Sequence, residues 1–155
     1  MDIIKGIMCG LFGCQQAQPD TIPAFPVRDR RQITAAEIIT VLSQKFPTAM
    51  IDPSDMVQSA CDIEDINTFL EQDQTNRIKY VTEKFDCDNF SFRLKGQFSI
   101  PGWATLSIGL VRTDLHMLSG FLDNNLQWWF IEPQTDGLSD KLATWQGSRV
   151  LYIII

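Results

Sequence analysis

Three residues that together could carry out nucleophilic chemistry occur in order along the chain: Cys87, His116 and Glu132. A thiol attacks as its thiolate, which an adjacent imidazole and the unpaired N–H groups of a helix start both favour. A carboxylate beside an imidazole fixes its tautomer and orientation. The set predicts a cysteine-nucleophile site in which Cys87 attacks, His116 acts as general base and acid, and Glu132 orients the histidine.

The sequence around Cys87 predicts the start of a short helix. An apolar helical pattern follows Cys87, and Gly96 is placed as its C-terminal stop, which gives about two turns. Asp86 has a side chain that can cap such a helix. The carboxylates of Asp86 and Asp88 oppose thiolate formation, so we expect them to point away from the sulfur.

A hairpin is expected to bring His116 and Glu132 together. Residues 123–125 read Asp-Asn-Asn between two apolar runs, which is a turn signal. A hairpin centred on Asn124 places His116 directly opposite Glu132, with Cβ atoms about 4.5–5.5 Å apart. A slip of one residue would put them on opposite faces. The same register places Gln134 near the mouth of the site, as a substrate contact.

Each of these residues also has a purely structural interpretation. A lone cysteine is commonly a small buried residue, a lone histidine in a strand is commonly structural, and Glu132 could be a surface charge at a strand end. Trp103 follows Pro-Gly in a loop and is the best tryptophan for a cleft wall, whereas Trp128 and Trp129 must point to opposite faces of one strand. With one histidine and no Cys-x-x-Cys, the sequence predicts no metal set of the zinc type.

Composition indicates one folded domain. The chain has 155 residues, of which 45% are hydrophobic and 21% charged, and a net charge of −6. The acidic balance disfavours nucleic acid as a partner. Four cysteines are too few for a disulfide scaffold, which favours a reducing compartment.

The first 30 residues differ from the rest. They form a mostly apolar N-terminal segment and a Pro-rich linker, and residues 31–155 form the expected domain. No stretch reaches the roughly 20 apolar residues that cross a bilayer, and the missing basic start disfavours a secretory signal. The segment is expected to dock on a partner or a membrane surface.

Helical signals come first along the chain and strand signals follow. Thr34 and Glu37 form a capping box for a helix that Pro47 ends, and Asp62 caps a second helix. Strands are expected around 56–60 and then at 104–113, 115–122, 127–132 and 149–155. This order predicts an α+β domain whose helices pack on an antiparallel sheet. The apolar last strand must be central or covered, because an exposed edge of that kind aggregates.

Two sequence blocks carry a family resemblance. Residues 85–90 read Phe-Asp-Cys-Asp-Asn-Phe, and residues 129–136 read Trp-Phe-Ile-Glu-Pro-Gln-Thr-Asp. With His116 between them, they resemble the papain-like C-terminal domain of the Marasmius oreades agglutinin and small phage-encoded proteins related to it, over about residues 47–155. The resemblance implies a papain-like fold and a catalytic triad of Cys87, His116 and Glu132.

The same resemblance has limits. Val81 stands where papain-type enzymes carry a glutamine, and nothing here matches the agglutinin's sugar-binding β-trefoil, so sugar binding is not implied. The fungal protein is calcium-activated, so the resemblance allows calcium here, although its ligands cannot be assigned residue by residue. No other cofactor is expected.

Together these features predict a cysteine peptidase that cleaves a peptide or isopeptide bond in a peptide or protein substrate. One alternative is a phage cell-wall peptidoglycan amidase or endopeptidase. Another is a non-catalytic, virion-associated structural module. A homodimer is left open, and so is the compartment, which would be the cytoplasm or the virion for a phage-encoded protein.

Overall fold

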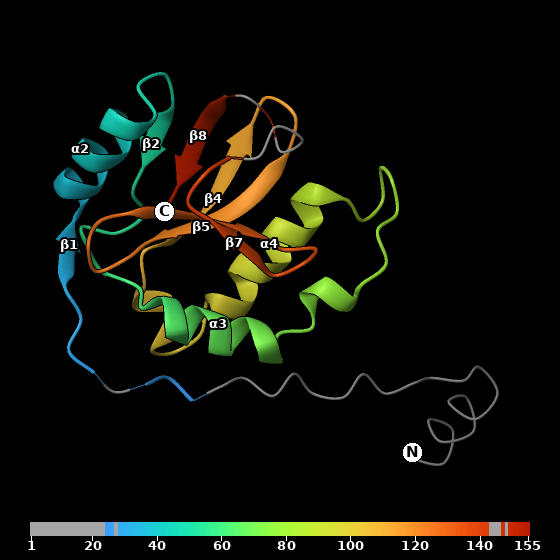
Figure 1. Cartoon of the computed structure of the whole chain (residues 1–155), viewed down its shortest axis with the longest axis horizontal. Helices are drawn as coiled ribbons and strands as arrows, with labels where there is room; N and C mark the ends of the chain where they lie inside the picture. The colour runs from blue at the N-terminus through green and yellow to red at the C-terminus, as the bar shows by residue number, and fades with distance from the viewer. Residues whose placement is uncertain (1–23, 27, 143–146, 148) are drawn as a thin grey trace, which may run out of the picture.

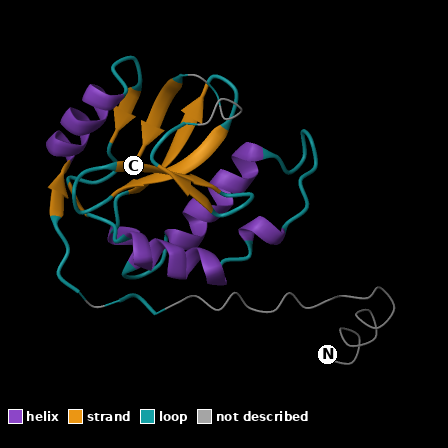
Figure 2. Ribbon diagram, viewed as in Figure 1, coloured by secondary structure: helices purple, strands orange, loops and turns teal. Residues whose placement is uncertain are grey.

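Most helices precede most strands in the computed structural model, which describes residues 24–26, 28–142, 147 and 149–155 (Figure 1, Figure 2). The helical elements are α2 (Ala35–Lys45), α3 (Ile63–Gln72), η1 (Thr75–Arg77), α4 (Cys87–Phe98) and η2 (Trp103–Thr105). The strands are β1 (Gln32–Thr34), β2 (Met50–Asp52), β3 (Val57–Ser59), β4 (Ile108–Thr113), β5 (Met117–Leu122), β6 (Trp128–Glu132), β7 (Gly137–Ser139) and β8 (Val150–Ile154). The chain is therefore a domain of mixed helix and sheet. The apolar N-terminal segment up to residue 23 lies outside the described residues.

Six strands form the main sheet, in the order β2-β8-β4-β5-β6-β7, and β1 and β3 form a separate pair. The prediction of an antiparallel sheet holds for every neighbour pair except β2 and β8, which are parallel. That exception arises because β2 and β8 come from opposite ends of the domain, and the long connection between them permits parallel pairing. The apolar C-terminal strand β8 lies between β2 and β4, as its composition required.

Helices cover both faces of this sheet. On one face, Ile38 and Leu42 of α2 pack in a cluster with Val111, Leu118 and Trp128. A second cluster on the other face joins side chains of α3 and α4 to the sheet, namely Ile66, Phe69, Leu94, Phe98, Ile108, Phe121 and Ile131. The two clusters take alternate residues of the same strands. The prediction that Trp128 and Trp129 point to opposite faces is confirmed, because they belong to different clusters.

The helix starts agree with the sequence signals. Thr34 donates its N–H to Glu37 Oε2 at 2.9 Å, and Glu37 returns its N–H to Thr34 Oγ1 at 3.3 Å, which confirms the capping box. Asp62 is the N-cap of α3 and accepts from the N–H of Glu64 at 3.0 Å. Both caps satisfy N–H groups that a helix start leaves without partners.

Helix α4 is longer than predicted. It runs through Gly96 to Phe98, and Leu94 and Phe98 are both buried. The glycine did not act as a stop because packing of the last turn against α3 and the sheet outweighs its weak helix propensity. The strand expected at 104–113 begins only at Ile108, since Trp103–Thr105 forms a 3-10 turn. Among the described residues, no helix is long and apolar enough to span a membrane.

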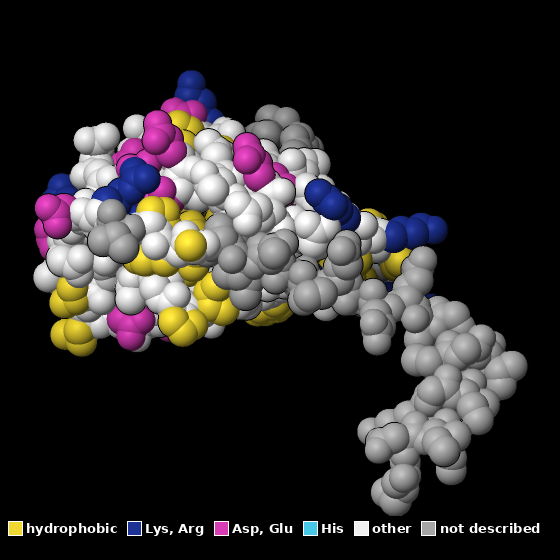
Figure 3. Space-filling model, turned by 90° about the horizontal axis from the view of Figure 1, so that it is seen from below, with side chains coloured by type: hydrophobic (Ala, Val, Ile, Leu, Met, Phe, Trp, Pro, Cys, Tyr) yellow, Lys and Arg dark blue, Asp and Glu magenta, His cyan; other side chains and the backbone are white. Residues whose placement is uncertain are grey.

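Seen from below Figure 1, the surface is mixed. Lys and Arg side chains are interspersed with Asp and Glu on this face, and hydrophobic side chains appear between them (Figure 3). The described residues on this face therefore show no large area of a single charge sign.

Candidate functional site

His116 is positioned by the turn between β4 and β5. The Thr113 hydroxyl accepts from the His116 N–H at 2.8 Å and donates to the His116 carbonyl at 2.9 Å. Thr113 also donates its own N–H to that carbonyl at 2.8 Å. The threonine is fully buried, and His116 is 9% exposed. His116 therefore lies just before β5 rather than within a strand, on a turn that hydrogen bonds hold from both sides.

Glu132, the last residue of β6, contacts the His116 ring. Glu132 Oε2 lies 2.8 Å from His116 Nε2, and both side chains are buried. The other carboxylate oxygen, Oε1, accepts the N–H of Gln134 at 3.1 Å. The histidine and glutamate that the sequence paired are thus in direct contact, and both oxygens of the carboxylate are occupied.

The hairpin that joins them has a different register from the predicted one. Ser119 pairs with Ile131, and Leu122 with Trp128, so the hairpin is centred on Asn125 and not on Asn124. This moves the pairing by two positions and makes Glu132 a diagonal neighbour of His116 instead of its direct partner. An even shift leaves side chains on the same face, and diagonal neighbours remain within reach of long side chains. The loop forms because the Asp123 carboxylate accepts the N–H groups of Asn125 and Gln127, each at 2.8 Å.

Cys87 is the first residue of α4, as the sequence predicted, with Asp86 as N-cap. Helix α4 lies along β4 and β5 (Figure 1). A hydrogen bond between the Asp86 and Asp88 carboxyl groups raises the pKa of Asp86 and lowers that of Asp88, and the charge of Arg112 lowers the latter further. Because Arg112 stands at the end of β4, the helix starts beside the β4–β5 connection that carries His116.

The two described cysteines differ in environment. Both are free thiols, but Cys61 is fully buried whereas Cys87 is partly exposed. Burial raises the pKa of the Cys61 thiol to about 12. Cys61 is therefore an inert core residue, and a reagent that seeks a thiol in the described part of the chain meets Cys87.

The predicted cleft wall, Trp103, lies in the interior. It is 1% exposed and packs against Phe25, Phe69 and Phe98. The interpretation of Trp103 as a substrate contact is therefore wrong. The aromatic residues around it draw the indole into the second core cluster. Gln134, the other predicted contact, is partly exposed beside Glu132, and its role as a substrate contact stays a prediction.

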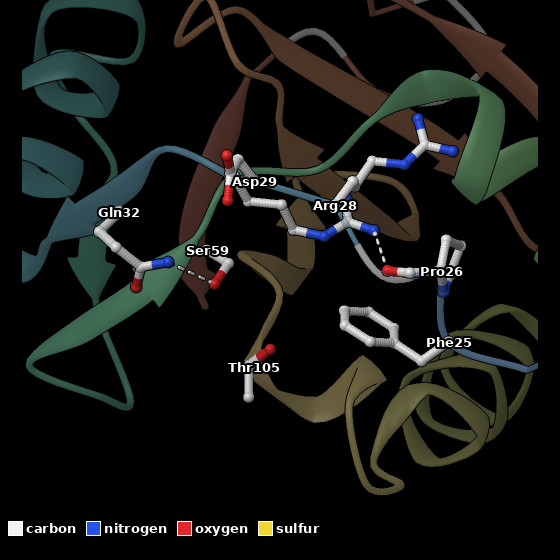
Figure 4. Close-up of a pocket in the computed structure, with 8 residues that line it drawn as sticks. Phe25, Pro26, Arg28, Asp29, Gln32, Ser59 and Thr105 are labelled. Carbon is white, nitrogen blue, oxygen red and sulfur yellow. Dashed lines mark hydrogen bonds between the residues drawn. The ribbon is translucent and has the colours of Figure 1, made fainter.

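A surface pocket that the sequence did not predict lies where the linker meets the domain (Figure 4). It has a volume of about 360 Å³ and is lined by Phe25, Pro26, Arg28, Asp29, Arg30, Gln32, Ser59 and Thr105. The Arg30 guanidinium lies over the Phe25 ring at 4.9 Å and pairs with Asp65 at 2.6 Å. The last residues of the predicted linker are therefore packed onto the domain. A single sequence has no local signal for this, because the pairing depends on which helix the linker crosses.

A group of polar side chains near Asp136 was also missed. Asp136 lies in the β6–β7 turn, and Asn76 of η1 donates to its Oδ2 at 2.5 Å. Burial, together with repulsion from Asp73, raises the pKa of Asp136 to about 6, while Arg77 opposes the rise. The described residues contain no cluster of three or more His, Cys, Asp or Glu side chains that could hold a metal. A cation here would need amide, hydroxyl or backbone oxygens as well.

The comparisons with known proteins identify the fold only. No family model and no curated protein sequence matches the chain. Among solved structures, the PSL1a–E64 complex matches with a TM-score of 0.67 and 18% identity, over 80% of this chain and 50% of the other. The Polyporus squamosus lectin bound to the human-type influenza-binding epitope Neu5Acα2-6Galβ1-4GlcNAc matches with a TM-score of 0.64 and 18% identity, over 80% and 49%. The chain thus shares its fold with about half of a fungal lectin chain.

These neighbours correct the functional prediction. They are lectins, so the predicted cysteine peptidase is contradicted, and so is its classification as a hydrolase. The alternatives of a peptidoglycan amidase and of a virion-associated module are not supported either, and neither structure is linked to a phage. The resemblance to a fungal agglutinin is supported at the level of fold. The prediction inferred a catalytic activity from the types of three residues, Cys87, His116 and Glu132. Residue types and contacts alone do not specify a reaction.

Proposed function

We propose that this chain is a ligand-binding domain with a papain-like arrangement of α4 against the sheet, and that its ligand contacts Cys87, His116 and Glu132. The observation that carries the proposal is the buried 2.8 Å contact between His116, just before β5, and Glu132, at the end of β6. The resemblance to the agglutinin domain supports the papain-like arrangement. Binding is proposed here, and turnover of a peptide is not.

The geometry suggests how such a ligand would be held. Glu132 engages His116 through Nε2, so the carboxylate fixes how the imidazole ring is oriented toward a ligand. A thiol whose proton an imidazole can accept is more reactive than a free thiol, which suits a thiol-directed probe. The first neighbour is a complex with E64, which makes E64 the natural probe.

The proposal is tested by incubating the full chain with E64 and measuring bound compound by intact-protein mass or calorimetry. We expect one equivalent to bind to the wild type and none to Cys87→Ala. Cys61→Ala is the matched control, because it removes a thiol that is buried and inert. Equal binding by wild type and Cys87→Ala would show that the site lies elsewhere.

Carbohydrate binding is a second candidate, favoured by the pocket in Figure 4 and by the glycan-bound neighbour. The pocket combines one aromatic ring, from Phe25, with carboxylate, amide and hydroxyl groups from Asp29, Gln32 and Thr105. Protein sites that hold polar ligands use this mixture of a flat apolar surface and a few polar groups. The chain spans only half of the lectin chains, so their glycan binding is not transferred to it as a fact.

This candidate is tested by titrating Neu5Acα2-6Galβ1-4GlcNAc into the isotope-labelled chain and following backbone amide shifts. A dissociation constant on the order of 1 mM is expected, with the largest shifts around Asp29 and Thr105. Asp29→Asn should weaken binding, and Asp55→Asn, an exposed carboxylate outside the pocket, should not. Absence of shifts at these residues would eliminate the candidate.

A further inference from the structure

The pocket where the linker meets the domain has a buried arginine in its wall. The pocket has a volume of about 360 Å³, and Arg30 lines it together with Phe25, Pro26 and Thr105 (Figure 4). The Arg30 side chain is only 4% exposed. A cationic side chain is rarely buried unless its hydrogen-bonding groups are paired. The partners of the Arg30 guanidinium therefore indicate what the pocket can accommodate.

Two of the three guanidinium nitrogen atoms of Arg30 have no partner among the described residues. Nη2 donates to Asp65 Oδ2 at 2.6 Å and to the Pro26 carbonyl at 3.4 Å. Nε and Nη1 are buried and form no hydrogen bond with the described part of the chain. Buried donors in native proteins are almost always paired, and leaving a charged donor unpaired costs more free energy than leaving a neutral one. The two nitrogen atoms therefore mark a place for an additional acceptor.

The positive charge of Arg30 is only partly neutralised by its surroundings. Within the described ranges its ion-pair partner is Asp65, and this carboxylate also pairs with Arg28 at 2.9 Å. Arg28 has a second partner in Asp62, again at 2.9 Å. One buried carboxylate is thus shared between two guanidinium groups, so Arg30 retains positive charge that attracts an anion.

We propose that this pocket binds a small monoanionic carboxylate, which accepts a hydrogen bond from the guanidinium of Arg30. Guanidinium groups bind carboxylates through strong, charge-assisted hydrogen bonds. The rings of Phe25 and Pro26 line the same pocket and would contact an apolar body attached to the carboxylate. Asp29 lines the pocket as well, and its negative charge would repel a ligand of higher charge, such as a sulfate dianion.

A carboxylate in this pocket requires neither the thiol site nor a glycan. The thiol site is formed by other elements, namely the start of α4 and the His116–Glu132 pair. A glycan in the pocket would use the Asp29 carboxylate as an acceptor for its hydroxyl groups, so Asp29→Asn should weaken glycan binding. The same substitution should strengthen binding of a carboxylate, because it removes a repulsion between two negative charges. The sign of the effect therefore separates the two kinds of ligand.

The probe is benzoate, which joins a carboxylate to an apolar ring, and benzamide is its uncharged counterpart. The isotope-labelled full chain is titrated with each compound while the Arg30 Nε–H resonance and the backbone amide resonances are followed. We expect benzoate to bind with a dissociation constant on the order of 1 mM and to shift the Arg30 resonance. Benzamide should bind at least about tenfold more weakly, because it lacks the charge that strengthens the hydrogen bond to Arg30.

Variants of the same chain test the two charges. Arg30→Lys keeps a charge opposite Asp65 but removes the guanidinium, and should weaken benzoate binding roughly tenfold. Asp29→Asn should strengthen it about twofold, and Asp55→Asn, which changes the net charge equally outside the pocket, should not. Cys87→Ala should bind benzoate as the wild type does, whatever the result of the E64 experiment.

Three results would each overturn the carboxylate site. They are equal binding of benzoate and benzamide, an Arg30 resonance that does not move as benzoate is added, and tighter binding of sulfate than of benzoate. If Arg30→Lys does not fold, the Arg30 resonance of the wild type still decides, because it reports directly on the guanidinium that the ligand must contact.

Discussion

Two carboxylates four residues apart on one segment are held in opposite ways. Glu132, at the end of β6, has one oxygen on the His116 ring and the other on the Gln134 N–H. Asp136, in the next turn, has one oxygen against Asn76, while the other is buried without a partner in the described structure. The first site is complete within the protein, and the second is not. The difference indicates that the His116–Glu132 pair satisfies its polar groups within the protein, whereas Asp136 keeps one buried oxygen without a hydrogen bond in the described structure.

The largest expected effect tests the completeness of the first site. Glu132→Ala removes the carboxylate that contacts the buried His116 ring and should lower the free energy of unfolding by about 2–3 kcal/mol. Urea unfolding at pH 7 measures this loss. Glu132→Gln, which keeps an acceptor of the same size, should lose less. A loss below about 0.5 kcal/mol for the alanine variant would mean that the pair contributes as little as a surface contact.

The next prediction tests whether His116, paired with Glu132, increases the reactivity of the Cys87 thiol. His116→Ala should slow alkylation of Cys87 by iodoacetamide roughly tenfold near pH 7, because the imidazole favours the reactive thiolate. The rate is measured by peptide mapping, which separates Cys87 from the other cysteines. Cys61 should stay unlabelled in the native protein, since it is fully buried. An unchanged rate at Cys87 would separate the thiol from the His116–Glu132 pair.

A third prediction concerns the pH dependence of stability at Asp136. The pKa of Asp136 is about 6 in the folded state, against an ordinary value of 3.8, so the folded state binds its proton more tightly. Its contribution to stability is therefore full below pH 3.8 and is lost as the pH rises through about 6. Solvent screening reduces the effect to about 1 kcal/mol. Asp73 and Arg77 are the charged groups that face it.

Unfolding by urea at a series of pH values between 4 and 7 checks this third prediction. Asp136→Asn should remove the part of the pH dependence that belongs to Asp136. Asp140→Asn removes a carboxylate just after β7 and should retain that dependence. The same slope in Asp136→Asn and wild type would assign the pH dependence to other groups.

The smallest effect is expected at Gln134. Its backbone N–H, and not its side chain, holds Glu132 Oε1. Gln134→Ala should therefore change the free energy of unfolding by no more than about 0.5 kcal/mol. If Gln134→Ala lowered the free energy of unfolding as much as Glu132→Ala does, the Gln134 side chain would also stabilise the His116–Glu132 pair.

Much of the local structure could be predicted, since its causes lie within a few residues. The capping box at Thr34, the cap at Asp62 and the start of α4 at Cys87 were correct because a cap and its helix are adjacent in the sequence. The parallel partner of the last strand could not be predicted, because strand order is set by packing across the whole domain. The burial of Trp103 was missed for the same reason.

The contact between His116 and Glu132 was predicted correctly, but from a hairpin register that the structure does not have. The hairpin was expected one residue earlier, at Asn124, but an even shift in pairing keeps alternate residues on one face, so His116 and Glu132 still meet. The turn formed where it did because Asp123 binds two N–H groups after it. Side-chain length then allowed a diagonal contact.

By itself, the sequence determined which residues begin the helices, which strands are buried, and that one histidine and one glutamate share a face. These follow from short-range sterics, capping and the twofold alternation of strands. Only the tertiary structure decided that the linker packs on α3, that Cys61 is buried and inert, and that Asp136 lies near Asp73 with one buried oxygen unpaired. Those features depend on burial and on contacts between segments distant in the sequence, where the protein replaces water as the partner of each polar group.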